Sequence, residues 1–299
     1  MPPVATETHM QTIEVDGLTL AYRSSGSGLP VLLLHGWPTS SHLWRAVMPP
    51  IAVRNRVIAL DLPGFGESGK PLEGYDFAFF DRILDGFLEA LALDRIGLAV
   101  HDLGGPIGLH WAVHRPTRLS RLAVLNTLVY PEFHLSAIDF VRGLLTPARR
   151  SVMTSPEGLA GLMHEGVADG STLGADVIAA VQAPFVSDDA RLALAAAGAG
   201  LRPSGFVDIA RLLPELTVPV RIVFGVQDRL LPDIADTVAR LRVDLPQVEI
   251  SELPGAGHFV QEDAPAEVGA ILAQFFSGPD VDRRPRVLAA PSDTDRMWA

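Results

Sequence analysis

The residues AVHDLGGPIG, at positions 99–108, form the most informative segment of this chain. The apolar start is typical of a strand end, HDLG of a sharp turn, and the glycines that follow of a helix that begins close to the strand. A serine exposed at such a turn would act as a nucleophile toward acyl groups. Here the turn presents the carboxylate of Asp102 instead. The segment therefore raises the question of which reaction a carboxylate serves at this place.

Segments of the same character surround this turn. Short apolar runs typical of strands buried on both faces occupy residues 30–36, 56–68, 96–102, 119–127, 218–228 and 248–258. Helices are predicted over 78–92, 104–114 and 264–276, and an N-terminal hairpin over 12–26 turns at Asp16-Gly17. Buried strands that alternate with helices predict an α/β fold, with a mostly parallel central sheet flanked by helices.

This alternation stops between residues 126 and 218. Residues 128–217 are rich in Ala, Leu and Gly and contain short helical patterns without a clear buried strand. We predict that they form a helical cap, inserted between two strands of a core domain made of residues 1–127 and 218–276. Residues 277–299 are rich in Pro, Asp and Arg without periodicity, and we predict a flexible C-terminal tail there.

The composition excludes several classes of function. Of the 299 residues, 48% are apolar and 20% are charged, and the net charge is −11. An acidic chain is a poor partner for nucleic acid or an anionic membrane, and no apolar run has the length of a membrane span. The absence of cysteine excludes disulfides, thiolate metal sites and a cysteine nucleophile. Because the N-terminus lacks the pattern of a signal peptide, we expect a soluble, cytoplasmic protein.

Four polar groups directly follow predicted strands: HGWP (35–38), HDLGG (101–105), GVQD (225–228) and GAGH (255–258). Open parallel sheets place their sites beyond the carboxyl ends of the strands. Taken alone, an aspartate there is usually a turn residue, and a single histidine is usually a surface or packing residue. Asp102, Asp228 and His258, however, occur in the order nucleophile, acid, histidine that is known for catalytic triads. We therefore predict that these three residues are catalytic.

Five longer strings extend this pattern: LLLHGWPTSSHLWR (32–45), ALDLPGFGESGKP (59–71), HDLGGPIGLHWAVHRP (101–116), VFGVQDRLLP (223–232) and LPGAGHFVQEDAP (253–265). With them the chain resembles the α/β-hydrolase superfamily over residues 12–276. Within it, the chain is similar to the branch with an aspartate nucleophile, the epoxide hydrolases and haloalkane dehalogenases. The resemblance implies an α/β-hydrolase fold with a cap and no cofactor. One departure is Val100, where that superfamily usually has a small residue.

In such a hydrolase the carboxylate of Asp102 displaces a leaving group from saturated carbon and becomes an ester. His258 then deprotonates the water that cleaves the ester, and Asp228 orients the imidazole. The water attacks the carbonyl carbon of Asp102, so an oxyanion develops on the side chain of the enzyme. The backbone N–H groups at the matching positions, Trp37 and Leu103, are expected to stabilise this oxyanion.

The leaving group distinguishes the substrates. An epoxide oxygen becomes an alkoxide and needs an acid, usually one or two cap tyrosines in the resembled epoxide hydrolases. A halide needs N–H donors, usually a Trp after the nucleophile plus an Asn or a second Trp. Here Leu103 follows the nucleophile, and Trp37 stands where many haloalkane dehalogenases carry Asn. Tyr130 at the cap entrance is the candidate proton donor and Trp37 a candidate substrate-binding residue; packing of Tyr130 at the cap hinge is the alternative.

The first hypothesis is thus an epoxide hydrolase that converts a small apolar epoxide to a vicinal diol. The alternatives are a haloalkane or haloacid dehalogenase with atypical halide donors, and a non-catalytic ligand-binding protein of the same fold. We expect a small-molecule substrate as the partner and a homodimer as the candidate assembly. His110 and His114 have a metal-ligand spacing on a helix, but without a visible third ligand we predict no metal site.

Overall fold

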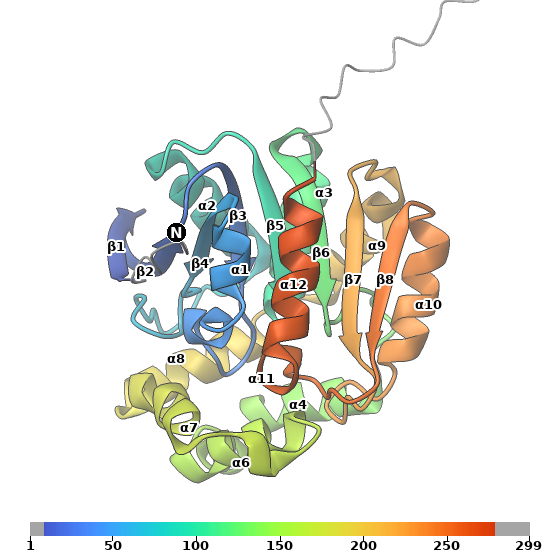
Figure 1. Cartoon of the computed structure of the whole chain (residues 1–299). Helices are drawn as coiled ribbons and strands as arrows, with labels where there is room; N and C mark the ends of the chain where they lie inside the picture. The colour runs from blue at the N-terminus through green and yellow to red at the C-terminus, as the bar shows by residue number, and fades with distance from the viewer. Residues whose placement is uncertain (1–8, 279–299) are drawn as a thin grey trace, which may run out of the picture.

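The centre of the protein is one eight-stranded sheet with the order β1-β2-β4-β3-β5-β6-β7-β8 (Figure 1). A computed structural model describes residues 9–278, so the predicted C-terminal tail lies outside the described residues from 279 onward. Strand β2 pairs antiparallel with β1 and β4, and all other neighbouring strands are parallel. The strands are Met10–Val15 (β1), Leu18–Ser25 (β2), Leu29–Leu34 (β3), Asn55–Leu60 (β4), Ile96–His101 (β5), Leu119–Leu125 (β6), Val220–Gly225 (β7) and Val248–Leu253 (β8).

Helices cover both faces of this sheet, with α1 and α12 on one face and α2 and α3 on the other (Figure 1). The α/β-hydrolase architecture predicted from the sequence is therefore confirmed. No described helix combines the length and the apolarity needed to cross a membrane. The helices of the core are Met48–Ala52 (α1), Phe77–Ala90 (α2), Gly104–His114 (α3), Ile234–Asp244 (α10), Val260–Asp263 (α11) and Pro265–Phe276 (α12), with short 3₁₀ helices at Ser41–Trp44 (η1) and Pro116–Arg118 (η2).

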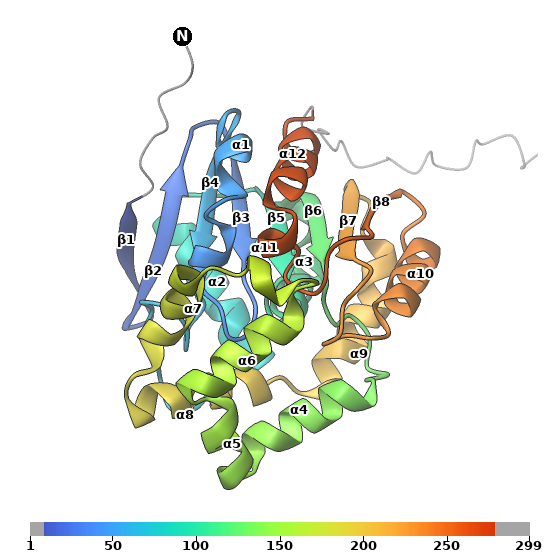
Figure 2. The same ribbon diagram turned by 60° about the horizontal axis from the view of Figure 1, so that its bottom comes forward.

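Between β6 and β7 the described chain is helical. Helices α4 to α8 lie across the carboxyl ends of the strands, and α9 lies beside the sheet (Figures 1 and 2). Phe206 of α9 packs edge-on against Phe77 of α2, with ring centroids 5.5 Å apart, which joins this segment to the core. The segment contains Leu135–Leu145 (α4), Pro147–Met153 (α5), Pro156–Gly166 (α6), Gly170–Thr172 (η3), Ala175–Gln182 (α7), Ala183–Phe185 (η4), Asp188–Ala199 (α8), Pro203–Leu212 (α9) and Leu213–Glu215 (η5).

The turn from β5 to α3 is tight because glycines surround it. Asp102 itself has a φ of 47°, in the left-handed region that favours glycine. A Cβ on Gly104 would lie 2.5 Å from the backbone oxygen of His35, and one on Gly105 would lie 1.7 Å from Oγ1 of Thr127. Helix α3 can therefore begin directly against the loops that follow β3 and β6, with Asp102 at the apex of the turn.

Val100 fits into β5 because α3 leaves space for it. Its side chain is buried. A Cβ on Gly108 of α3 would lie 2.5 Å from Cγ1 of Val100. The glycine thus compensates for a side chain that is larger than usual at this position, and helix and strand stay closely packed.

This pairing predicts a coupled effect on stability. Gly108→Ala should lower the free energy of unfolding by about 1–3 kcal/mol, because the new methyl group overlaps with Val100. In a Val100→Ala background the same change should be neutral or stabilising, since alanine exceeds glycine in helix propensity by about 1 kcal/mol. Urea unfolding of the four variants measures the coupling. An equal loss in both backgrounds would contradict the match between the two residues.

Candidate active site

The carboxylate of Asp102 lies at the carboxyl end of β5, between two backbone N–H donors. The N–H of Trp37 donates to Oδ1 over 2.7 Å. The backbone N–H of Leu103 also lies near this carboxylate and lowers its pKa. Gly36 makes the approach of the first loop possible, because a Cβ there would lie 2.3 Å from Cβ of Asp102. The two N–H groups predicted from the sequence therefore do contact the side chain of Asp102.

His258 and Asp228 complete the predicted group. Nδ1 of His258 is 2.9 Å from Oδ2 of Asp228, and because a carboxylate only accepts, Nδ1 is the donor. Nε2 of the same ring points to the other side and lies 3.5 Å from Oδ2 of Asp102. The imidazole thus stands between two carboxylates that lie 126 residues apart in the chain (228 minus 102). Its side chain is 1% exposed.

Asp228 is held by four hydrogen bonds. Oδ1 accepts from the backbone N–H groups of Leu230 and Leu231, over 2.9 and 2.8 Å. Oδ2 accepts from His258 and from the side-chain amide of Asn126, over 2.8 Å in the latter case. A carboxylate with all its acceptor directions used cannot rotate freely, so Asp228 fixes the orientation of the imidazole.

Asn126 is a residue that the sequence analysis did not assign to the site. Its backbone oxygen accepts from the N–H of Asp102 over 3.0 Å, and its amide binds Asp228. Its Oδ1 also accepts from the N–H of Gly225. Asn126 directly follows β6 and has a φ of 20°. The sequence did contain a signal for it. Asn126 is a polar residue at the end of β6, which lies between β5 and β7, the strands that precede Asp102 and Asp228.

His101, which directly precedes Asp102, contacts the backbone of His258. Its Nε2 donates to the backbone oxygen of His258 over 3.0 Å, and its ring is buried. Burial, together with the positive charge of His258, lowers the pKa of His101 to about 4. His101 is therefore a neutral donor at physiological pH, and it positions the backbone of the catalytic histidine candidate.

The two carboxylates determine the charge of His258. Burial lowers the pKa of His258, but the charges and hydrogen bonds of Asp228 and Asp102 outweigh it and raise the pKa to about 10. Burial likewise raises the pKa of each carboxyl group, but His258 and the N–H donors hold both pKa values below the ordinary range. At pH 7 the site therefore holds an imidazolium between two carboxylates.

The side chain of Asp102 remains partly accessible. Its side chain is 23% exposed, whereas that of Asp228 is fully covered. Trp37 lies beside it with the indole ring edge-on to Phe140 of α4, at a centroid distance of 5.0 Å. The indole N–H donates to the backbone oxygen of Leu194 in α8 over 3.1 Å. Trp37 thus links the loop after β3 to the cap, and of the two acidic groups only Asp102 can meet a ligand.

The prediction that Tyr130 donates a proton above Asp102 is wrong. Its hydroxyl group donates to Oδ2 of Asp244 in α10 over 2.7 Å, and the guanidinium group of Arg240 lies 3.7 Å from its ring centre. Burial and the charge of Asp244 raise the pKa of Tyr130. The phenol therefore ties the cap entrance to α10 and retains its proton.

The two other tyrosines do not donate to Asp102 either. The chain has three tyrosines, all within residues 9–278. Tyr22 donates to Oε1 of Gln11, and Tyr75 donates to the backbone oxygen of Pro71. His134 and His164 are exposed on the cap surface. Each of the three tyrosine hydroxyl groups therefore donates to an acceptor other than Asp102.

Comparison with known proteins agrees with this architecture. The family model described as alpha/beta hydrolase fold matches residues 30–151. A haloalkane dehalogenase of Sphingobium indicum is 31% identical over 294 residues, which cover 88% of this chain and 93% of that protein. A soluble epoxide hydrolase of a Corynebacterium species is 36% identical over 121 residues, 40% of this chain and 42% of that one. The crystal structure of haloalkane dehalogenase DbeA from Bradyrhizobium elkani has a TM-score of 0.80 at 27% identity, with 91% of this chain and 98% of that chain covered.

The charge of His258 predicts a pH dependence of stability. A pKa raised from the ordinary 6.5 to about 10 contributes stability that is complete below pH 6.5 and is lost as the pH rises to 10. The difference in the free energy of unfolding between the wild type and His258→Gln should therefore shrink over this interval. Denaturant unfolding at several pH values measures it. A difference that stays constant from pH 6.5 to 10 would contradict the charged pair.

Proposed function

Because the chain belongs to the α/β-hydrolase superfamily, in its aspartate-nucleophile branch, we propose that it is a hydrolase that removes halide from a haloalkane through an ester on Asp102. The observation that carries this proposal is the placement of Nε2 of His258 3.5 Å from Oδ2 of Asp102, in a site to which no tyrosine of the chain donates. The coarser statement, a hydrolase of this superfamily, rests on the fold and on the relatives.

The first step is a displacement at saturated carbon. Oδ1 of Asp102 accepts from the N–H of Trp37 and becomes the carbonyl oxygen of the ester, so Oδ2 is the attacking atom. A bond forms between Oδ2 and carbon, the carbon–halogen bond breaks, and the halide leaves with the bonding electron pair. The lowered pKa of Asp102 keeps the carboxylate ionised and ready for this attack at neutral pH.

The first step prepares the second one electrostatically. Esterification removes the negative charge of Asp102, which is one of the two carboxylate charges that raise the pKa of His258. The pKa of the imidazole therefore falls, and His258 can release its proton to solvent and act as a base. Asp228 remains bound to Nδ1 and holds Nε2 toward the ester.

In the second step water cleaves the ester. Nε2 of His258 takes a proton from a water molecule, and the hydroxide adds to the carbonyl carbon of Asp102. The negative charge on Oδ1 develops in front of the N–H groups of Trp37 and Leu103, and such a donor contributes about 3–4 kcal/mol in comparable sites. Collapse releases the alkoxide, which receives the proton of His258, and the regenerated carboxyl group of Asp102 then gives its proton to His258, which restores the resting imidazolium.

The leaving group favours a haloalkane over the epoxide that the sequence analysis placed first. A halide is a weak base that leaves without a proton, whereas the alkoxide from an epoxide requires an acid. The candidate acid, Tyr130, donates to Asp244. Relatives that match most of the chain, such as the one from Sphingobium indicum, also carry the name haloalkane dehalogenase. Both lines of support are independent of each other, since one is chemical and the other evolutionary.

An epoxide remains the second candidate because of Leu103. The resembled dehalogenases usually place a tryptophan directly after the nucleophile, and this chain has a leucine there. One of the relatives is named a soluble epoxide hydrolase. The indole of Trp37 is a further N–H group beside the nucleophile, although it donates to Leu194 in this structure. Parallel assays of halide release from 1-bromohexane and of diol formation from styrene oxide distinguish the two candidates.

A trapped ester tests the mechanism. His258→Gln should react with 1-bromohexane once and stop, because displacement needs Asp102 while hydrolysis needs the imidazole. Mass spectrometry of the intact protein should show one added hexyl group, located by peptide mapping on Asp102. Asp102→Asn is the matched control and should remain unmodified. An unmodified His258→Gln protein, with a wild type that does release bromide, would contradict the two-step mechanism.

Tyr130 provides a second test. Tyr130→Phe should leave the turnover number for the accepted substrate within about twofold, because the lost hydroxyl contacts Asp244 and not the substrate. The substitution should instead lower the free energy of unfolding by about 1–3 kcal/mol, because it removes a hydrogen bond to a charged group. Steady-state kinetics and urea unfolding of the same preparation measure both. A large drop in turnover with unchanged stability would restore Tyr130 as the acid.

A further inference from the structure

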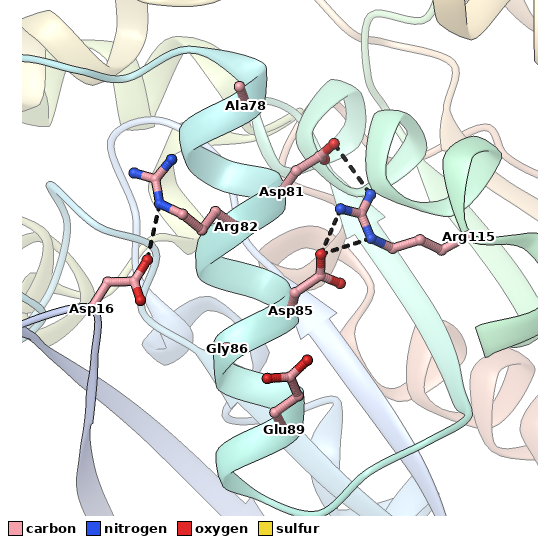
Figure 3. A pocket seen from close by; sticks show the side chains of 8 residues that line it. All are labelled: Asp16, Ala78, Asp81, Arg82, Asp85, Gly86, Glu89 and Arg115. Atoms are coloured by element: carbon pink, nitrogen blue, oxygen red, sulfur yellow. Dashed lines mark hydrogen bonds and ion pairs between the residues drawn. The ribbon is translucent and has the colours of Figure 1, made fainter.

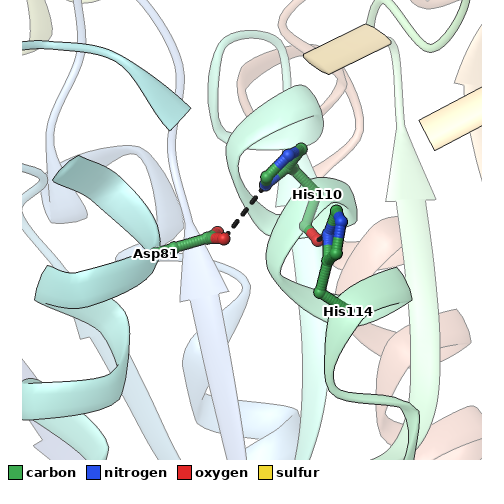
Figure 4. A group of neighbouring side chains, drawn as sticks. All are labelled: Asp81, His110 and His114. Atoms are coloured by element: carbon green, nitrogen blue, oxygen red, sulfur yellow. Dashed lines mark hydrogen bonds and ion pairs between the residues drawn. The ribbon is translucent and has the colours of Figure 1, made fainter. Parts of the chain in front are cut away.

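A second group of chemically active side chains lies outside the candidate active site, between α2 and α3. His110 and His114 are one turn apart on α3, and Asp81 of α2 faces them (Figure 4). One ligand atom from each of the three residues lies within 4.8 Å of the other two. The sequence showed the two histidines but no third ligand, because Asp81 precedes His110 by 29 residues and reaches it only through helix packing.

The hydrogen bonds of both imidazoles leave the same ring nitrogen free. Nδ1 of His110 is 3.1 Å from Oδ2 of Asp81, and Nδ1 of His114 is 2.8 Å from the backbone oxygen of His110. A carboxylate and a carbonyl oxygen only accept, so each Nδ1 carries the proton. Each Nε2 then has a lone pair, and neither Nε2 has a hydrogen-bond partner within residues 9–278. Metal-binding histidines usually have this arrangement, with the second nitrogen donating to an oxygen.

One carboxylate oxygen of Asp81 accepts no hydrogen bond from the described residues. Its Oδ1 is buried and has no hydrogen-bond partner among the described residues, while Oδ2 accepts from His110 and Arg115. A buried carboxylate oxygen without a donor is costly unless a cation or a donor compensates for it. The ring of His110 is stacked on Phe77 at 4.5 Å, which limits its rotation and holds its nitrogens in place.

Acidic side chains lie next to Asp81 on the side away from the two histidines, and arginines are paired with some of them. A hollow of about 470 Å³ adjoins Asp81, and its lining contains four carboxylates and two guanidinium groups, a net charge of −2 (Figure 3): Asp16, Asp81, Asp85, Glu89, Arg82 and Arg115. Arg115 is closer to Asp85, with contacts of 2.5 and 2.9 Å, than to Asp81 at 3.2 Å. Asp85 also accepts from Arg118 over 3.2 Å, so the two arginines share Asp81 and Asp85, and Asp81 offers a second cation only part of its negative charge.

From these observations we propose that His110, His114 and Asp81 form a binding site for a divalent transition-metal ion of the zinc type. Imidazole nitrogens with a carboxylate suit Zn²⁺, Ni²⁺ or Cu²⁺ better than Mg²⁺ or Ca²⁺, which prefer oxygen ligands. The Nε2 atoms of both histidines bind the ion, Asp81 accepts from Nδ1 of His110 and so orients its ring, and water completes the coordination. The ion binds to α3, the helix that begins beside Asp102, while Asp81 of α2 holds one of its ligands, and the ion is not part of the hydrolytic reaction.

Titration of the metal-free, full-length protein with ZnCl₂ tests this site. Isothermal calorimetry should show one Zn²⁺ per chain, and excess Zn²⁺ should raise the melting temperature, because the ion binds only the folded arrangement of α2 and α3. His114→Ala should abolish both effects, and Asp81→Asn should weaken binding about 10- to 100-fold. His164→Ala, an exposed histidine on the cap, is the matched control and should bind like the wild type.

The identity of the ligands has its own readout. Cu²⁺ bound to the wild type should give an electron paramagnetic resonance spectrum with coupling to two imidazole nitrogens, and His114→Ala should reduce this to one. Absence of saturable Zn²⁺ binding to the wild type would overturn the proposal. Binding that persists unchanged in His114→Ala would overturn it as well, since the ion would then lie elsewhere.

Discussion

The ionised carboxylate of Asp102 is the group on which the other features of the site depend. It is mostly covered by protein, with 23% of its side chain exposed, so its charge needs compensation. Backbone N–H groups of Trp37 and Leu103 supply part of it, and the imidazolium of His258 supplies the rest. In the proposed mechanism these groups have a second role: the two N–H groups donate to the oxyanion, and His258 acts as the base. A reaction that neutralises Asp102 therefore also activates the group that restores it.

The fold explains how contacts between distant parts of the chain reach this precision. Trp37, Asp102, Asn126, Asp228 and His258 follow β3, β5, β6, β7 and β8, whose carboxyl ends meet along one edge of the sheet. Parallel register sets the spacing of these ends, and the glycines at 36, 104 and 105 let the loops approach Asp102 closely. Helices α4 to α8 then lie across this edge (Figure 2).

Much of this arrangement was predictable from the sequence, and the exceptions share one cause. Apolar runs that end in polar residues locate strand ends, so Asp102, Asp228 and His258 were assigned correctly to one edge of the sheet. The partner of Tyr130 was not predictable, because Asp244 is 114 residues away and meets it only when the cap entrance packs on α10. The approach of Asp81 to His110 likewise depends on how α2 packs against α3. Local patterns identify elements and their ends, whereas the partner of an individual polar group depends on the packing between elements.

The central claim is that water attacks the carbonyl carbon of Asp102 and not the substrate. Turnover of a reactive haloalkane in H₂¹⁸O tests it most directly, with mass analysis of the peptide that contains Asp102 and of the alcohol. In a single turnover with excess enzyme, ¹⁸O should enter Asp102, and the alcohol should carry only the oxygen that came from the carboxylate. After many turnovers both should contain ¹⁸O. An alcohol labelled in the first turnover, with an Asp102 that never acquires ¹⁸O, would contradict the account.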